Sequence, residues 1–152
     1  MKGTIVIGCD HGGYGTKQAV IKELAKRDYT IVDVGGFSDK ESDDYPVSAK
    51  QVADAGASDR TGMTRGILIC GSGTGMAIAA NKVRGIRAAL AYDAYSARMA
   101  RHDNDANVLT LRGRRFPARE AARLARIFLT TEFSGIDRHR RRIGKIAGME
   151  RR

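Results

Sequence analysis

Short apolar runs alternate with stretches of helical periodicity along this chain. The apolar runs are four or five residues long, and runs of that length between polar residues are typical of buried strands. They lie at residues 4–7, 30–34, 66–70, 88–91 and 108–111. Between and after them, apolar residues recur at the three- and four-residue spacing of a helix. This spacing predicts helices over residues 17–26, 47–57, 76–82, 95–101 and 117–129, and we expect a further helix over residues 137–150.

The alternation of strand and helix predicts an α/β domain with a five-stranded parallel sheet and helices on both faces. Strands that are apolar along their whole length are buried on both sides, which is the pattern of a parallel sheet. The chain has 152 residues, enough for one hydrophobic core and too few for two. In such sheets ligands bind beyond the carboxyl ends of the strands, so we expect the functional site at that edge.

Three of the predicted strands end in polar residues flanked by glycine. The segments that follow the first, third and fifth strands are residues 8–13 (GCDHGG), 70–75 (CGSGTG) and 112–115 (RGRR). Because parallel strands end at the same edge of the sheet, these segments are expected to lie close together. Their convergence predicts a site more strongly than any one of the motifs does.

The glycine loop at residues 71–75 precedes a predicted helix, and its backbone N–H groups can form a cradle for negative charge. It is not a Walker A loop, because it lacks the Lys-Ser/Thr ending. Its glycine spacing, with Asp93 about 20 residues further on, is a superficial match to a dinucleotide site. A set of tight strand-to-helix turns without a ligand would explain the same glycines.

Cys70 is the candidate nucleophile or base, because a thiol at a helix N-terminus is favoured in its thiolate form. A small buried hydrophobic residue is the alternative reading, and it is the better one for Cys9. Asp10 and His11 form a polar pair in a glycine turn and are candidates for either a functional or a structural role. The N-terminal residues run straight into a strand without a secretory leader, so we expect reduced cysteines and a cytoplasmic protein.

The formal charge of +10 is concentrated at one end of the chain. Residues 112–152 hold 13 Lys and Arg against 4 Asp and Glu, which leaves +9 there. Arg138 and Arg142 share one helix face and could clamp a phosphate, whereas Arg140 and Arg141 point elsewhere. A solvated basic tail is the alternative. Nucleic-acid binding is poorly supported, because aromatic residues are 6% of the chain and none alternates with the arginines.

Several segments together resemble the type B ribose-5-phosphate isomerase family, to which galactose-6-phosphate isomerase subunits also belong. The resemblance covers nearly the whole chain, with the matching segments in the family's order. The segments that carry it are residues 8–14, 44–46, 66–76, 79–89, 104–109, 130–133 and 138–142.

The resemblance implies a Rossmann-like α/β subunit that isomerises a phosphorylated sugar, most simply ribose 5-phosphate to ribulose 5-phosphate. It implies a homodimer, possibly paired into a tetramer, whose active sites are shared between subunits. Residues 1–135 would form the isomerase domain, and residues 136–152 a basic helical extension that reaches the partner subunit. No metal, organic cofactor, nucleic acid or membrane is expected as a partner.

The same resemblance implies a role for each matching residue. Cys70 resembles the base that moves a proton between C1 and C2, and Met76 stands where some relatives have a catalytic Glu instead. The enediolate would be stabilised by Ser72 and by the backbone N–H groups of Gly71, Gly73, Thr74 and Gly75. Asp10 and Asn104 would contact sugar hydroxyls. The phosphate would be held by His11 and Arg114, and by Arg138 and Arg142 of the partner subunit.

One position departs from the family pattern. Many relatives carry a ring-opening histidine directly before the position of Asn104, where this chain has Asp103, with His102 one residue earlier. On a helix that displacement turns a side chain by about 100°. Either residue could act as the acid–base, or the substrate could be a tetrose 4-phosphate, whose blocked O4 leaves no furanose ring to open. A non-enzymatic nucleotide- or nucleic-acid-binding module remains the distant alternative.

Overall fold

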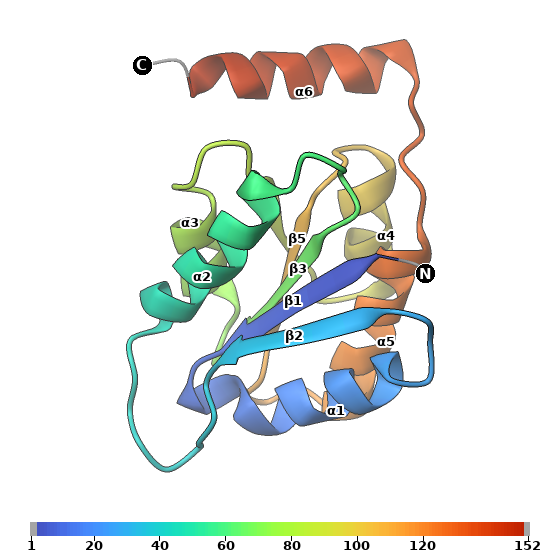
Figure 1. Cartoon of the computed structure of the whole chain (residues 1–152). Helices are drawn as coiled ribbons and strands as arrows, with labels where there is room; N and C mark the ends of the chain where they lie inside the picture. The colour runs from blue at the N-terminus through green and yellow to red at the C-terminus, as the bar shows by residue number, and fades with distance from the viewer. Residues whose placement is uncertain (1–2, 151–152) are drawn as a thin grey trace.

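The computed structural model describes residues 3–150, and its centre is a five-stranded sheet in the order β2-β1-β3-β5-β4 (Figure 1). All neighbouring strands pair in parallel. The strands are β1 (Thr4–Cys9), β2 (Thr30–Gly35), β3 (Arg65–Cys70), β4 (Ala88–Leu90) and β5 (Val108–Arg112). The predicted α/β class, the number of strands and their parallel direction are therefore confirmed.

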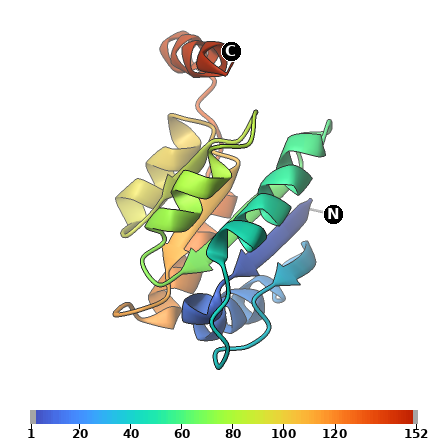
Figure 2. The ribbon, with the colours of Figure 1, turned by 90° about the vertical axis from the view of Figure 1, so that its left-hand side faces the viewer.

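Helices cover both faces of the sheet. The helical elements are η1 (His11–Gly13), α1 (Tyr14–Leu24), α2 (Tyr45–Ser58), α3 (Thr74–Ala80), α4 (Ala94–His102), α5 (Ala118–Thr130) and α6 (Asp137–Met149). α2 and α3 lie side by side on the face turned toward the viewer in Figure 2. α1, α4 and α5 share the other face, where their buried residues belong to one apolar cluster.

The core lies on both sides of β1 and β3, because successive side chains of a strand point to opposite faces. Ile7 and Ile69 pack toward α1 and α5, whereas Leu68 and Cys70 pack toward α2 and α3. Gly66 lets α2 approach closely, since a Cβ atom there would lie 2.6 Å from Cγ1 of Val52. This packing fixes the carboxyl ends of the two central strands, where the predicted motifs begin.

Three helices begin two or three residues earlier than their apolar periodicity predicts, and one of them is α2, which begins at Tyr45 rather than residue 47. α1 begins at Tyr14 rather than residue 17, because the 3₁₀ turn η1 leads directly into it. α3 begins at Thr74 rather than residue 76, after Gly73 turns the chain with a φ of +80°. The polar first turns of these helices carry no apolar signal, so periodicity alone misses them. Pro46 lies in the first turn of α2, as predicted.

α6 stands apart from the α/β body, beyond the amino ends of the strands (Figures 1 and 2). His139 is its one buried residue among those described, and Ile146 and Met149 are exposed. Beyond the last turn, the Glu150 carboxylate accepts hydrogen bonds from the backbone N–H of Gly85 at 3.0 Å. No helix in the described part of the chain is long and apolar enough to cross a membrane.

Candidate active site

Cys70 ends β3 at the entrance to the glycine loop, and its side chain is buried. The backbone N–H of Gly73 donates a hydrogen bond to Sγ of Cys70 over 3.1 Å. Only a glycine suits position 73, because its φ is +80° and a Cβ atom would lie 2.6 Å from Cδ1 of Leu90. The loop therefore holds a backbone donor on the sulfur. The donor and the sulfur thus face each other at the mouth of the loop.

Asp10 follows β1 directly and lies beside β3, where its backbone N–H donates to the carbonyl of Ile69 at 3.1 Å. Its side chain is only 7% exposed, and its Oδ1 is buried without a hydrogen-bond partner. Burial raises the pKa of the Asp10 carboxyl, against the opposing effects of the nearby His11 charge and of hydrogen bonds from the loop backbone. An unsatisfied acceptor of this kind can receive a hydroxyl of a bound sugar.

His11 connects an acidic loop to Arg114. Its Nδ1 lies 2.9 Å from Oδ1 of Asp43, which also accepts the backbone N–H of His11 at 2.8 Å. On the other side, Nε2 of His11 lies 3.4 Å from Nη2 of Arg114. Partial burial acts to raise the pKa of Asp43, but the hydrogen bonds from His11 outweigh it and the pKa is lowered. Asp43 was missed from sequence, because it lies in a polar loop with no motif of its own.

Arg114 spans the two glycine turns. A Cβ atom on Gly12 would lie 3.2 Å from its Nε, and one on Gly71 would lie 3.4 Å from its Cδ. The backbone N–H of Arg114 donates to the carbonyl of Gly71 at 3.1 Å, and that of Gly113 donates to the carbonyl of Cys70 at 2.8 Å. The ends of the first, third and fifth strands of the sequence therefore meet, as predicted.

Two further polar side chains lie at the glycine loop, one within it and one packed against it. Within the loop, Oγ of Ser72 accepts the backbone N–H of Thr74 at 3.3 Å. The ring of Tyr45, at the start of α2, packs against Gly75, where a Cβ atom would lie 2.7 Å from Cζ. No role was predicted for Tyr45. Its position in the segment 44–46, which carries part of the family resemblance, was the available signal.

The remaining predicted site residues lie at the opposite end of the sheet. α4 runs back from the carboxyl ends of the strands and ends at His102, so the residues after it precede β5. The α6 residues also lie at this end (Figure 1). A strand's length, about 16–20 Å, therefore separates this group from Cys70 within one chain. The group consists of His102, Asp103, Asn104, Arg138 and Arg142.

Asp103 is the centre of a histidine cluster at this second end. Its Oδ1 lies 2.7 Å from Nδ1 of His102 and 3.7 Å from Nε2 of His139. The other ring nitrogen of His139, Nδ1, lies 2.6 Å from Oγ of Ser134. The hydrogen bond from His102, followed by the nearby charges of His139 and Arg138, lowers the pKa of Asp103, and burial opposes this. His139 was missed because it lies within a run of arginines.

The same cluster is the group of side chains best placed to hold a metal ion in the described part of the chain. One ligand atom from each of His102, Asp103 and His139 lies within 4.8 Å of the others. Nδ1 of His102 already forms a hydrogen bond with Asp103 over 2.7 Å, whereas Nε2 of His139, at 3.7 Å, makes only a longer ion-pair contact with it.

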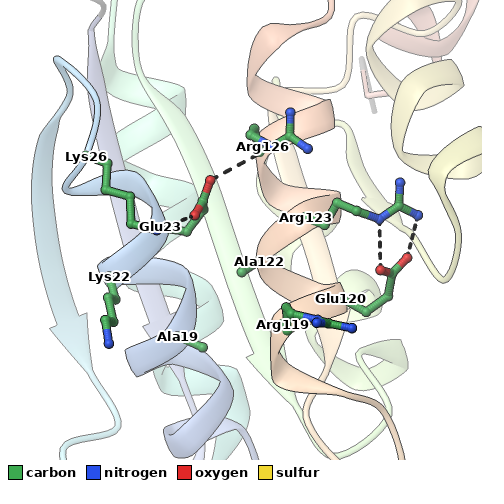
Figure 3. Close-up of a pocket in the computed structure, with 9 residues that line it drawn as sticks. All are labelled: Ala19, Lys22, Glu23, Lys26, Arg119, Glu120, Ala122, Arg123 and Arg126. Carbon is green, nitrogen blue, oxygen red and sulfur yellow. Dashed lines mark hydrogen bonds and ion pairs between the residues drawn. The ribbon is translucent and has the colours of Figure 1, made fainter.

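A cavity of about 590 Å³ lies elsewhere, between α1 and α5 (Figure 3). Its carboxylates are paired with cations: Glu23 lies 3.1 Å from Lys26, and Glu120 lies 2.8 Å from Arg123. None of the predicted site residues lines it, and its lining holds no cysteine, serine or histidine. The lining residues are Ala19, Lys22, Glu23, Lys26, Arg119, Glu120, Ala122, Arg123 and Arg126. The chemistry therefore points to the glycine loop rather than to this cavity.

Comparison with known proteins places the chain in a family. Residues 5–146 match the family model described as Ribose/Galactose Isomerase. The chain is 39% identical to ribose-5-phosphate isomerase B of Escherichia coli over 148 residues, which cover 97% of each chain. The structure of Clostridium thermocellum ribose-5-phosphate isomerase B is 44% identical, with a TM-score of 0.89 and 97% of each chain covered.

A further solved structure is ribose-5-phosphate isomerase B of Mycoplasma genitalium with bound ribulose-5-phosphate. It is 39% identical, has a TM-score of 0.93, and the match covers 99% of this chain and 97% of the other. The resemblance predicted from the motifs is thereby confirmed. This chain belongs to the ribose/galactose isomerase family and is an aldose–ketose isomerase.

Proposed function

We propose that this enzyme interconverts ribose 5-phosphate and ribulose 5-phosphate, with Cys70 as the base. The relatives named above as ribose-5-phosphate isomerases span nearly the whole chain, which supports the pentose phosphate as substrate. The two buried cysteines are unbridged, which supports the cytoplasm as the compartment. The single observation that carries the mechanism is the hydrogen bond from the Gly73 N–H to the Cys70 sulfur.

The reaction moves one proton between adjacent carbons of the open-chain sugar. The Cys70 thiolate removes the proton from C2 of the aldose, and the electron pair forms the C1–C2 double bond of an enediolate. Backbone N–H groups of the glycine loop and the Ser72 hydroxyl stabilise the charge on oxygen. The thiol then returns the proton to C1, and the hydroxyl on C2 passes its proton to the oxygen on C1, so that C2 becomes the ketone and C1 carries the hydroxyl. Asp10 holds a sugar hydroxyl through its unsatisfied Oδ1.

The phosphate is held by His11 and Arg114 of the same chain. Arg138 and Arg142 join them from a second chain, because within one chain they lie at the far end of the sheet. A two-fold homodimer brings the amino end of one sheet to the carboxyl end of the other, and so forms two equal sites. The exposed apolar residues of α6, Ile146 and Met149, supply the surface that such a partner would cover. A tetramer would need further contacts between such dimers.

Ring opening is assigned to His102 of the second chain. Ribose 5-phosphate is mainly a furanose, so a proton must reach its ring oxygen before C2 becomes acidic. Asp103 accepts the Nδ1 proton of His102 and leaves Nε2 to exchange a proton with the sugar. Because the Asp103 carboxylate is already engaged by two histidines, it serves as the orienting group. Asn104 would contact a sugar hydroxyl from the same side.

The proposal is tested with the purified enzyme and a panel of tetrose, pentose and hexose phosphates, measuring ketose formation. Ribose 5-phosphate is expected to have the highest kcat/KM of the panel, and Cys70→Ala should abolish its turnover while the fold is kept. A tetrose 4-phosphate with a kcat/KM above that of ribose 5-phosphate would overturn the assignment of the substrate. Full activity of Cys70→Ala would overturn the mechanism.

A further inference from the structure

A second cleft, of about 450 Å³, opens on the β4 side of the glycine loop. It adjoins the catalytic cysteine through Gly71, the residue after Cys70, although Cys70 itself does not line it. The cleft is lined by Gly71, Ser72, Thr74, Leu90, Tyr92, Arg112, Arg114 and Arg115. Four of these residues also belong to the proposed catalytic site: Gly71, Ser72, Thr74 and Arg114. The other four do not.

The charge of this cleft is entirely positive. Three arginines line it and no carboxylate does. None of the ion pairs found among residues 3–150 includes Arg112, Arg114 or Arg115. This contrasts with the cavity between α1 and α5, where both glutamates are paired with cations. Three unpaired arginines on one concave surface favour the binding of an anion.

Arg112 has an unsatisfied donor at this place. Its Nε is buried without a hydrogen-bond partner, and its guanidinium lies over the ring of Phe116, with Cζ 4.6 Å from the ring centroid. The ring fixes the plane of the guanidinium and so limits the directions in which it can donate. A buried guanidinium nitrogen without an acceptor is rare in a folded protein, and an anion in the cleft is one source of acceptors for this side chain.

Arg115 adopts a backbone conformation that an arginine rarely adopts. Its φ is +52°, in the left-handed region, and Asp105 is the other non-glycine residue with a positive φ in the described chain. Conformations of this kind persist where the surrounding structure holds them, and they gather at ligand sites. Here the turn puts Arg115 on the wall of the cleft that Ser72 and Thr74 also line.

We propose that this cleft is a second anion subsite, in which Arg112 and Arg115 bind a phosphate dianion beside the sugar-phosphate site. The dianion is either free inorganic phosphate or the second phosphate of a bisphosphorylated sugar whose first phosphate lies at His11 and Arg114. The guanidinium groups and the loop hydroxyls supply donors of the kind that phosphate oxygens prefer. The position of the first phosphate rests on the proposed function, but the existence of the second subsite does not.

The test counts inorganic phosphate bound by the full-length protein, by calorimetry at constant ionic strength with chloride as the balancing anion. The wild-type chain is expected to bind two phosphates. Arg115→Gly removes the cation and relieves the positive φ, so it should fold normally and bind one. Arg112→Met keeps the apolar contact with Phe116 and should also bind one. The matched control, Arg119→Gln on the cavity between α1 and α5, should bind two.

The two sources of the dianion are separated by inhibition of the isomerase. If the second phosphate of a sugar occupies the subsite, the inhibition constant of ribulose 1,5-bisphosphate should rise at least tenfold in Arg115→Gly. The inhibition constants of ribulose 5-phosphate analogues with one phosphate should change less. If free phosphate is the occupant, only the stoichiometry changes. A phosphate count that Arg115→Gly and Arg112→Met leave unchanged, or equal losses in Arg115→Gly and Arg119→Gln, would mean an adventitious ion only and would overturn the subsite. The stoichiometry needs no turnover, so this outcome is distinct from failure of the proposed function.

Discussion

The backbone N–H of Gly73 points at the sulfur of Cys70 across 3.1 Å. The helix that follows, α3, has only seven residues, so the loop's own N–H groups, rather than a long helix, supply the positive field at this sulfur. The arrangement makes Cys70 the acceptor of a fixed donor at the mouth of a glycine loop. That is the requirement for a base that must also lie close to a developing enediolate.

Replacing Cys70 with alanine should lower kcat for ribose 5-phosphate by roughly 10²–10⁴-fold, because a positioned general base contributes about that much. The thermal transition should fall by only a few degrees, because one buried sulfur is lost from an apolar cluster while the rest of its packing is kept. The assay is the initial rate of ketose formation.

The matched control is Cys9→Ala, at the other cysteine. Cys9 is fully buried, its Sγ lies 3.3 Å from the carbonyl of Gly36, and burial raises the pKa of its thiol to about 12. This variant should lose about 1 kcal/mol of stability and keep most of its turnover. Equal losses of turnover in the two variants would remove the special role of Cys70.

Gly73→Ala should damage both the fold and the activity. The change forces an L-residue to a φ of +80°, which costs about 1–2 kcal/mol, and puts Cβ within 2.6 Å of Leu90. In Gly71→Ala the new Cβ has an ordinary contact of 3.4 Å with Arg114, so stability should change little. Urea unfolding of the two variants measures the difference. Equal free energies of unfolding would contradict the described loop.

Asp10→Asn should change the pH dependence of stability in a defined direction. Because burial raises the pKa of Asp10, the folded protein binds its proton more tightly than the unfolded chain does. Stability due to this group is therefore present below the ordinary aspartate pKa of about 3.9 and falls as pH rises through the raised value.

The Asp10→Asn variant lacks this loss, so its stability relative to wild type should rise across that pH window. Its KM for ribose 5-phosphate should rise as well, because a sugar hydroxyl loses an acceptor. Urea unfolding between pH 4 and 8 provides the measurement. If the free energies of unfolding of the two proteins change with pH in the same way, the pKa of Asp10 is not raised by folding.

His102→Ala should lower kcat for ribose 5-phosphate by about 10²-fold, and Asp103→Asn should lower it by a smaller factor. Both should act far less on 4-deoxyribose 5-phosphate, which lacks O4 and cannot form a furanose. The ratio of kcat values on the two sugars isolates ring opening from proton transfer. An equal loss on both sugars would remove His102 from ring opening.

The sequence was sufficient for the fold because the two signals it needs are local. Strands such as β3 are apolar along their length, and glycines mark their carboxyl ends. From these the parallel sheet and the meeting of Asp10, Cys70 and Arg114 follow. The starts of α1 and α3 were missed because their first turns are polar.

Contacts made only by tertiary folding could not be predicted in the same way. Asp43 reaches His11 from a loop 32 residues away, and His139 becomes buried only because α6 returns to the end of α4. Asn104 lies at the opposite end of the sheet from Asp10, because it precedes β5 whereas Asp10 follows β1. That separation is what makes a second subunit necessary to the proposed site.

Complementation between two inactive variants tests the shared site most directly. Cys70→Ala and the double variant Arg138→Ala with Arg142→Ala are each purified and then mixed under conditions that allow subunits to exchange. A mixed dimer contains one site with an intact Cys70 and intact arginines from the neighbouring chain. The prediction is that isomerase activity toward ribose 5-phosphate, absent from either protein alone, returns to about a quarter of the wild-type value, as random pairing of two-fold dimers requires. No recovery after demonstrated exchange would contradict a site built from both chains.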